Sequence, residues 1–371
     1  MISTFYERIV GTSPPPEPNE PKILCVGLSC LDIVQLCKHY PEEDTDQRCI
    51  DFRYQRGGNA SNNCTVMSQF GQPCEFLGAL SNEQFSRFLQ DDMRKHKIDF
   101  SHCPMVEDGR CPTSVVVLSM STGSRTIIHH NQNHVEITLQ DFEKLNLEDY
   151  SWVHFEGRNI AEVLLMMQHI ENYNRSLAQT PSEGADKFTH HHLPITISVE
   201  LEKMRPELLD LLPYADVAFV SKDFAECRGY VNMSETLKSV SQDAKTGATI
   251  FSAWGDRGAM ARAPDGSIVQ SPAFPPYKII DTLGAGDTFN ASILYYLNKE
   301  KLAYKKGSKS DESAKNEILQ NYNIESSEKS QTEFINRDVL QGAVNFGCRL
   351  AGAKIGLRGF EGLCDVYKNY L

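Results

Sequence analysis

The chain has 371 residues, 40% hydrophobic and 23% charged, which is typical of a globular protein with a large core, and no apolar run approaches the ~20 residues that cross a bilayer. The net charge of −12, without a dense Lys/Arg cluster, disfavours nucleic acid as a partner, because neutralising phosphates takes a concentrated basic surface. The eleven cysteines are dispersed without a Cys-x-x-Cys pair and no signal peptide is evident, so we predict reduced thiols, no zinc and a cytoplasmic location away from membranes.

Residues 1–21 are predicted to form a disordered tail, because five prolines crowd the stretch from Gly11 to Pro21. A single domain is expected from residue 22 to residue 366. It opens with the apolar run 23–28, which suits a strand buried on both faces. Similar runs occupy 152–156, 195–199, 217–220 and 248–252.

Segments with helical spacing of apolar residues separate these strands. The residues that carry this spacing are Cys64, Met67 and Phe70, then Phe85, Phe88 and Leu89, then Val163, Leu164, Met167 and Ile170. Strands and helices that alternate in this way predict an α/β fold, with a doubly wound, mostly parallel sheet flanked by helices.

Two stretches, about 29–57 and about 111–131, interrupt this alternation. The second contains a predicted hairpin of residues 113–120 and 125–130, rich in β-branched side chains. We expect the two stretches to form a small β-sheet lid over the site. Residues 299–336 are polar and predict a surface insertion, and a shorter polar insertion is expected at about 174–192, where His190 to His192 suit a solvated loop.

The strongest motif is Asp281-Thr-Leu-Gly-Ala-Gly-Asp287, which leads into a predicted helix. Without side chains at Gly284 and Gly286, backbone N–H groups can approach phosphate oxygens, and the helix dipole adds favourable charge. Asp287 would then accept the proton of an attacking hydroxyl. The alternative, taken alone, is a plain turn with Asp287 as N-cap.

A second motif, Arg56-Gly-Gly-Asn-Ala-Ser-Asn62, also leads into a helix and sets Asn59 and Asn62 on one face. Amide side chains match the hydroxyls of a neutral sugar, although N-capping is an alternative. Asp32 follows the first strand and would bind sugar hydroxyls or form an Asx-turn. The loop at 252–258 follows another strand and suits nucleotide phosphates or a β-turn.

Together the two glycine motifs closely resemble the signatures of the ribokinase-like (phosphofructokinase-B) carbohydrate kinases, over residues 22–365. Other matching segments are Glu156–Asn159, Val220–Asp223, Ala273–Pro276 and Phe346–Cys348, which favour the ketose-phosphorylating members. The resemblance implies transfer of the ATP γ-phosphoryl group to a ketose, D-fructose giving D-fructose 1-phosphate. Its sugar-binding residues would be Asp32, Gly58, Asn59 and Asn62, with Asp287 as base and Gly284, Ala285 and Gly286 as anion hole.

The same resemblance implies that Arg125 reaches the ATP phosphates and that the β lid makes a homodimer. Residues lining the nucleotide would be Gly255, Asp256, Arg257, Gly258, Phe274, Pro275 and Cys348. Magnesium would accompany ATP, but its protein ligands are unknown, because the family's Asn-x-x-x-Glu-type element reads Ser221 to Glu226 here. Potassium is expected as an activator that binds backbone oxygens near the glycine loop.

Three other functions compete with this hypothesis. A related kinase would act on ribose, adenosine or a keto-sugar acid through the same anion hole. A non-catalytic paralogue would bind sugar or nucleotide only, and the presence of both Gly286 and Asp287 argues against it. A dinucleotide-binding oxidoreductase is rejected, because no Gly-x-Gly-x-x-Gly follows the first strand, where Gly27-Leu-Ser29 stands instead.

Overall fold

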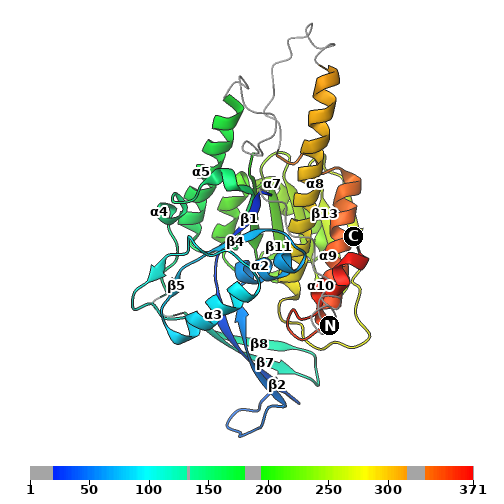
Figure 1. The fold of residues 1–371 in the computed structure, drawn as a ribbon. Coiled ribbons are helices and arrows are strands. Elements are labelled where there is room, and N and C mark those ends of the chain that lie inside the picture. Colours follow the sequence, from blue (N-terminus) through cyan, green and yellow to red (C-terminus); the bar gives the residue numbers. More distant parts are fainter. Residues whose placement is uncertain (1–19, 132–133, 180–193, 316–330, 371) are drawn as a thin grey trace, which may run out of the picture.

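The computed structural model describes residues 20–131, 134–179, 194–315 and 331–370. An eight-stranded sheet forms the centre, in the order β14-β13-β12-β11-β10-β9-β1-β4 (Figure 1). The pairs from β4 to β12 are parallel, and β13 and β14 add antiparallel at one edge. The strands are β1 (Lys22–Val26), β4 (Cys74–Leu77), β9 (Tyr150–Phe155), β10 (Thr196–Leu201), β11 (Val217–Ser221), β12 (Thr249–Ala253), β13 (Ala259–Arg262) and β14 (Ile268–Ser271).

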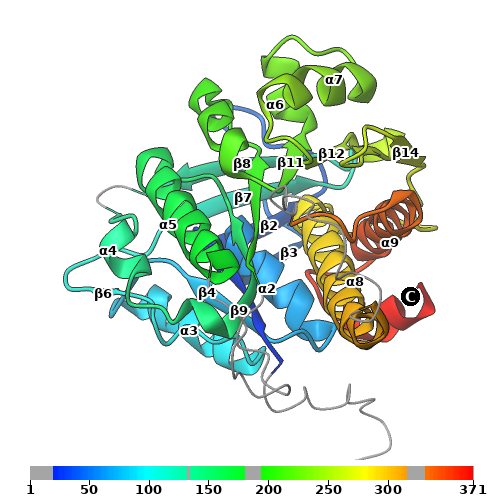
Figure 2. The same cartoon turned by 90° about the horizontal axis from the view of Figure 1, so that it is seen from above.

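Alternate residues of each central strand enter two separate cores, which explains the unbroken apolar runs. Ile23 packs with the helices on one face, and Leu24 packs with those on the other. The first core contains α2 (Asn59–Gln69), α8 (Ala285–Lys315), α9 (Arg337–Ile355) and α10 (Leu363–Val366). The second contains α4 (Leu139–Phe142), α5 (Ile160–Gln179), α7 (Met233–Asp243) and the 3-10 helix η2 (Pro206–Tyr214). Figure 2 shows α5 and α8 on opposite sides of the sheet.

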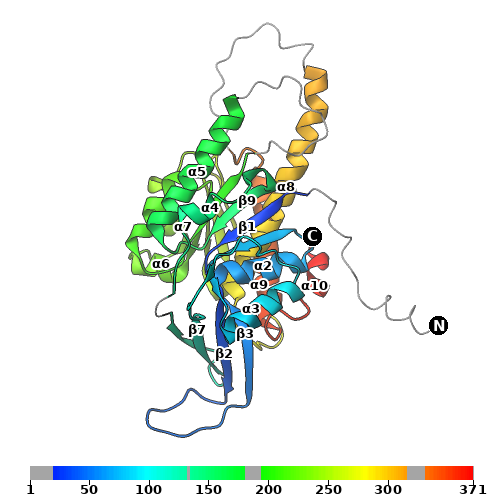
Figure 3. The ribbon, with the colours of Figure 1, turned by 60° about the vertical axis from the view of Figure 1, so that its left-hand side comes forward.

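A second sheet of four strands projects from the core, in the order β3-β2-β7-β8 (Figure 3). Its strands are β2 (Cys30–Cys37), β3 (Asp51–Gly57), β7 (Thr113–Ser119) and β8 (Arg125–His130). β7 and β8 form the predicted antiparallel hairpin, and β2 pairs in parallel with β7. This sheet therefore joins the two stretches that break the strand–helix alternation, and we refer to it as the lid.

Short elements complete the connections. A two-stranded sheet pairs β5 (Leu80–Ser81) with β6 (Met105–Val106). The remaining helices are α3 (Gln84–Lys95), α6 (Lys222–Cys227), η1 (Leu147–Asp149), η3 (Gly255–Arg257) and η4 (Tyr367–Asn369). Across the described residues, no helix combines the length and apolarity that crossing a membrane requires. All eleven cysteines are free thiols, and eight of them are buried.

The polar stretch at 299–336, predicted as a surface insertion that is partly helical or disordered, contains residues that are buried. Helix α8 continues without a break to Lys315, and Lys301 in its middle is buried. Its ammonium group donates hydrogen bonds to the carbonyl oxygens of Ser151 and Pro194, so it ties the helix to the sheet. Phe334, at the far end, is also buried. Because Lys301 is one charged residue within a polar stretch, its sequence neighbours give no signal that it is buried. Residues 316–330 lie outside the described part of the chain.

Other expectations shift or cannot be followed. Phe85 and Phe88, predicted on the packed face of α3, are each 38% exposed and lie beside Tyr54 of the lid, with ring centroids 6.3 Å apart in both pairs. Helix α5 runs to Gln179, so the insertion expected at about 174–192 begins as a helix. Residues 190–192 and most of the expected tail, 1–19, lie outside the described residues.

Candidate active site

Helix α8 starts at Ala285, inside the strongest motif of the sequence. Asp287 is therefore the third helical residue, so the alternative that it serves as N-cap is wrong. The first N–H groups of a helix have no partner within the helix and carry the positive end of its dipole. The turn before Asp287 thus has the electrostatic character of an anion site.

Three glycines shape this region, two through their backbone conformation and one through the space it leaves open. Gly284 has φ +80°, and a Cβ there would lie 2.6 Å from the ring of Phe360. Gly58, which precedes α2, has φ +95°, and a Cβ there would overlap the main chain of Leu28. A Cβ on Gly286 would meet nothing within 4 Å, so this position opens to free space. Backbone conformation explains the first two glycines, whereas the third leaves the approach to the helix end open.

The two glycine motifs meet at one hydrogen bond. Nδ2 of Asn62, on α2, donates to Oδ2 of Asp287 at 2.7 Å, although 225 positions separate the residues in the chain. Burial raises the pKa of Asp287 to about 8, the negative charge of Glu200 adds to this shift, and the hydrogen bond from Asn62 opposes it. A carboxyl group with a pKa near neutrality is suited to accepting a proton during a reaction.

Asn59 lies one turn earlier on α2, and its contacts were not predicted. Its Nδ2 donates to Glu200 Oε2 at 2.8 Å and to Glu202 Oε2 at 2.9 Å, so both amide hydrogens are engaged. The Oδ1 atom of Asn62 is buried and has no partner among the described residues. Sequence reasoning missed Glu200 and Glu202; the signal was present, since both lie at the carboxyl end of a buried strand, where α/β folds place ligand-facing groups.

Asp32 lies on lid strand β2 and is 6% exposed. Burial raises its pKa to about 6, whereas hydrogen bonds from Ser114 and Cys30 and the charge of Arg53 lower it. Gly57, on the neighbouring strand β3, packs directly on this carboxylate, and a Cβ there would overlap it. Neighbouring residues of the lid therefore fix the position of the Asp32 carboxylate.

The lid is latched to the glycine loop. Nη2 of Arg53 donates to Oδ2 of Asp281 at 2.6 Å, and Asp281 also accepts the N–H groups of Leu283 and Gly359. The buried ammonium of Lys354 donates to the main-chain oxygen of Asp281 at 2.8 Å. Asp281 thus joins the lid, the start of the loop and helix α9.

Glu156, which directly follows β9, ties the glycine motif at the start of α2 to the chain after β1. Its Oε2 atom accepts the N–H groups of Leu28, at 2.8 Å, and Ala60, at 3.2 Å, and Arg158 donates to its Oε1 atom at 3.3 Å. This buried carboxylate joins the ends of β1 and β9 to the start of α2.

The predicted nucleotide residues are only partly gathered. Gly255, Asp256 and Arg257 form η3 and Gly258 ends it, at the carboxyl end of β12. The guanidinium of Arg349 lies 4.3 Å from the centroid of the Phe274 ring, and Phe274 precedes Pro275 in the chain. Cys348, the residue before Arg349, is buried. Arg125 starts the exposed lid strand β8 and is paired there with Leu118, and no described contact joins it to the glycine loop.

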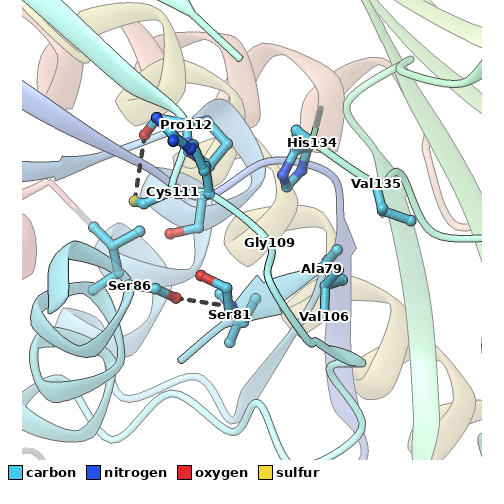
Figure 4. Close-up of a pocket in the computed structure, with 13 residues that line it drawn as sticks. Ala79, Ser81, Ser86, Val106, Gly109, Cys111, Pro112, His134 and Val135 are labelled. Carbon is cyan, nitrogen blue, oxygen red and sulfur yellow. Dashed lines mark hydrogen bonds between the residues drawn. The ribbon is translucent and has the colours of Figure 1, made fainter. Parts of the chain in front are cut away.

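A cavity near the lid lies apart from these residues (Figure 4). It is lined at the hinges of the lid by Ser29, Cys111, Pro112 and His134, and none of the predicted site residues line it. Within the described ranges, no group of three or more His, Cys, Asp or Glu is arranged to hold a metal ion. In the Ser221–Glu226 element, Ser221 caps α6 and Glu226 pairs with Lys222 at 3.5 Å. The candidate site is therefore the cluster around Asp287.

A glycine loop that opens a helix beside a carboxyl group of raised pKa, at the carboxyl ends of a doubly wound sheet, is suited to phosphoryl transfer. Residues 20–314 match the pfkB family carbohydrate kinases. The chain belongs to this family and is a carbohydrate kinase, as the motifs predicted.

Individual relatives refine this assignment. The chain is 40% identical to ketohexokinase of Mus musculus over 346 residues, 93% of this chain and 99% of that protein. It is 22% identical to 5-dehydro-2-deoxygluconokinase of Bacillus subtilis over 289 residues, 74% of this chain and 83% of that protein. The predicted similarity to ketose-phosphorylating members is thus confirmed in the form of a ketohexokinase-like sequence.

Solved structures confirm the predicted fold. A ribokinase from Giardia lamblia superposes with a TM-score of 0.72 at 16% identity, covering 95% of this chain and 98% of that one. A fructokinase with bound ATP from Xylella fastidiosa gives a TM-score of 0.66 at 14% identity, covering 94% and 97%. The ribokinase-like α/β architecture is therefore shared across most of each chain.

Proposed function

We propose that this kinase transfers the γ-phosphoryl group of ATP to the 1-hydroxyl of D-fructose, giving D-fructose 1-phosphate and ADP. The observation that carries the proposal is the hydrogen bond between Asn62 and Asp287, which joins the sugar-side helix to the phosphate-side helix. Similarity to a ketohexokinase supports the choice of fructose. The other carbohydrate kinases of the family remain the alternative.

In the proposed step, the sugar hydroxyl oxygen attacks the γ-phosphorus while the bond to the β-phosphate oxygen of ATP breaks. The hydroxyl proton passes to the Asp287 carboxylate, and ADP leaves. Charge that builds on the transferring group would be stabilised by the N–H groups at Gly284, Ala285 and Gly286. Mg-ATP is the substrate, since the metal neutralises the phosphates, and the phosphates themselves supply much of its coordination.

The polarity of the sugar side favours a neutral polyol. Asn59 has both amide hydrogens engaged, and Asn62 directs one at Asp287 while its Oδ1 stays without a partner. Asp32 and Asp287 add carboxylate oxygens. A surface of acceptors suits a ligand rich in hydroxyl donors and repels an anionic sugar acid, so the site supports fructose over a keto-sugar acid.

Some cofactor and partner expectations stay predictions. A potassium ion near the loop would be disfavoured at the carbonyl of Asp281, because the Lys354 ammonium that donates to this oxygen repels a second cation. A homodimer through the lid is supported by an exposed apolar surface on its edge strands. The exposed side chains are Phe52, Tyr54, Ile127 and Ile128. A cytoplasmic location is consistent with free cysteines throughout.

The test is an ADP-release assay with Mg-ATP across fructose, tagatose, ribose, glucose, adenosine and 5-dehydro-2-deoxygluconate. We expect the highest kcat/KM with fructose, and a 1-phosphate product by nuclear magnetic resonance. Faster turnover of ribose, adenosine or the sugar acid would contradict the substrate. Sedimentation of the protein at several concentrations tests the dimer, and a monomer throughout would contradict it.

A further inference from the structure

One buried carboxylate connects both sides of the candidate site. Glu200, at the end of β10, is 1% exposed. Its Oε1 atom accepts hydrogen bonds from Asn63 at 2.9 Å, His154 at 2.9 Å and Asn290 at 3.0 Å, while Oε2 accepts from Asn59 at 2.8 Å. These donors come from α2, β9 and α8. None of these side-chain contacts belongs to the backbone pairing of β10 with its neighbouring strands.

The surrounding hydrogen bonds define where the protons lie. The Trp152 indole N–H can only donate, and it donates to Ser198 Oγ at 2.8 Å. The Ser198 hydroxyl lies 2.8 Å from His154 Nδ1. Because an ionised carboxylate can only accept, His154 Nε2 is the atom that donates to Glu200. The hydrogen bonds from His154, Asn59 and Asn63 outweigh burial and hold the pKa of Glu200 at about 2, so all four N–H groups face an anion.

We propose that Glu200 is a positioning residue that fixes the sugar-binding helix against the phosphate-binding helix and makes Asn59 present only its amide oxygen to the sugar. An amide with both hydrogens committed cannot turn to donate to a carboxylate ligand. The inference deepens the proposed function and rests on it. Glu200 would thereby select neutral polyols over anionic sugar acids without touching either.

The same charge acts on the base. The titratable and charged groups that face Asp287 are Glu200 and Glu202 from the end of β10, Glu156 from the end of β9 and Lys354 from α9. Among the carboxylates, Glu200 contributes most to the raised pKa of Asp287. Removing its charge therefore lowers the pKa of Asp287. The pH range in which kcat/KM rises, as Asp287 loses its proton, then moves to lower pH.

The test is Glu200→Gln, which keeps the shape and removes the charge. We expect the KM for the wild-type sugar to rise at least about tenfold with the KM for ATP within twofold, because the freed amide of Asn59 loses its fixed orientation. Preference for fructose over 5-dehydro-2-deoxygluconate falls, and the pH limb shifts downward. Asp287 titration by carbon-13 resonance reports the same shift without turnover.

Glu75→Gln is the matched control. Glu75 is also fully buried and is contacted by Lys22, His102 and Tyr150, but it lies at the amino end of β4. It should lower thermal stability while leaving sugar KM and pH profile unchanged. Equal effects of the two variants on KM and pH profile would overturn the proposal, because Glu200 would then act only through stability.

If the Glu200→Gln variant does not fold, the same measurements are made on the Glu202→Gln variant. Glu202 is 40% exposed at its side chain and accepts one hydrogen of Asn59. We expect it to raise the sugar KM several-fold with a smaller pH shift, and an unchanged KM would overturn the proposal. Wild-type protein that phosphorylates another sugar but not fructose refutes the proposed substrate alone, and the variants are then compared with that sugar.

Discussion

Replacing Asp287 by Asn separates the base from its surroundings. The amide keeps an oxygen that accepts the hydrogen bond from Asn62, so sugar affinity should stay within a few-fold of wild type. The amide cannot accept the proton of the attacking hydroxyl, and we expect kcat to fall by about 10² to 10⁴-fold. Steady-state assays of ADP release, with fructose binding measured by calorimetry, separate the two effects.

The same variant should be more stable at alkaline pH. The pKa of Asp287 is raised from an ordinary value of 3.8 to about 8. The native state therefore holds this proton more tightly than the unfolded state, and wild-type stability falls as pH rises from about 4 to 8. The full shift, from 3.8 to about 8, corresponds to at most about 6 kcal/mol at about 1.4 kcal/mol per pKa unit. Because the side chain is partly accessible from the site, we expect about half of this.

Urea unfolding of both proteins at pH 4.5 and pH 8 measures the difference. The free energies of unfolding should nearly agree at the lower pH, and the Asn variant should be more stable by about 2 to 3 kcal/mol at the higher pH. The low-pH comparison is the internal control for any change in packing. A variant with wild-type turnover would refute the role of Asp287, and a pH-independent difference would refute its raised pKa.

Three further substitutions test the architecture around this base. Arg53→Ala breaks the latch to Asp281, and we expect the KM values for both substrates to rise together; a change in only one would show that the lid and the loop act separately. Gly284→Ala places a Cβ against a ring in a left-handed backbone conformation and should lower the melting temperature and abolish activity, so an active variant would contradict the tight loop. Asn62→Ala should raise the sugar KM by roughly 5 to 150-fold and move the pH limb upward, opposite to the Glu200 variant, and a downward shift would contradict the stated electrostatics.

The central sheet and its helices were predictable because the local pattern of apolar residues reflects which faces of each element are buried. Runs such as 23–28 are apolar throughout, since both faces of their strands are covered, and the fully buried β9 and β10 repeat this pattern. The lid hairpin was predictable from its β-branched residues. The two glycine motifs identified the family, because positive backbone angles and helix ends impose sequence constraints that are local.

The burial of Lys301 in helix α8 and the exposure of Phe85 and Phe88 on α3 were not predictable in this way. Lys301 is buried because carbonyl groups of distant strand ends surround it, and its neighbours in sequence are polar. Phe85 and Phe88 look like core residues by spacing, but they face a lid tyrosine instead. In each case the deciding partner is far away in the chain.

The sequence by itself determined the class of fold, the family and the chemical types gathered at the two helix starts. Only the tertiary structure decided how those groups are oriented. Asn62 donates one hydrogen bond to Asp287, and Asn59 donates both of its amide hydrogens to the carboxylates of Glu200 and Glu202. Hydrogen-bond direction and pKa depend on neighbours within a few ångströms in space, and those neighbours come from strands and helices that folding alone brings together.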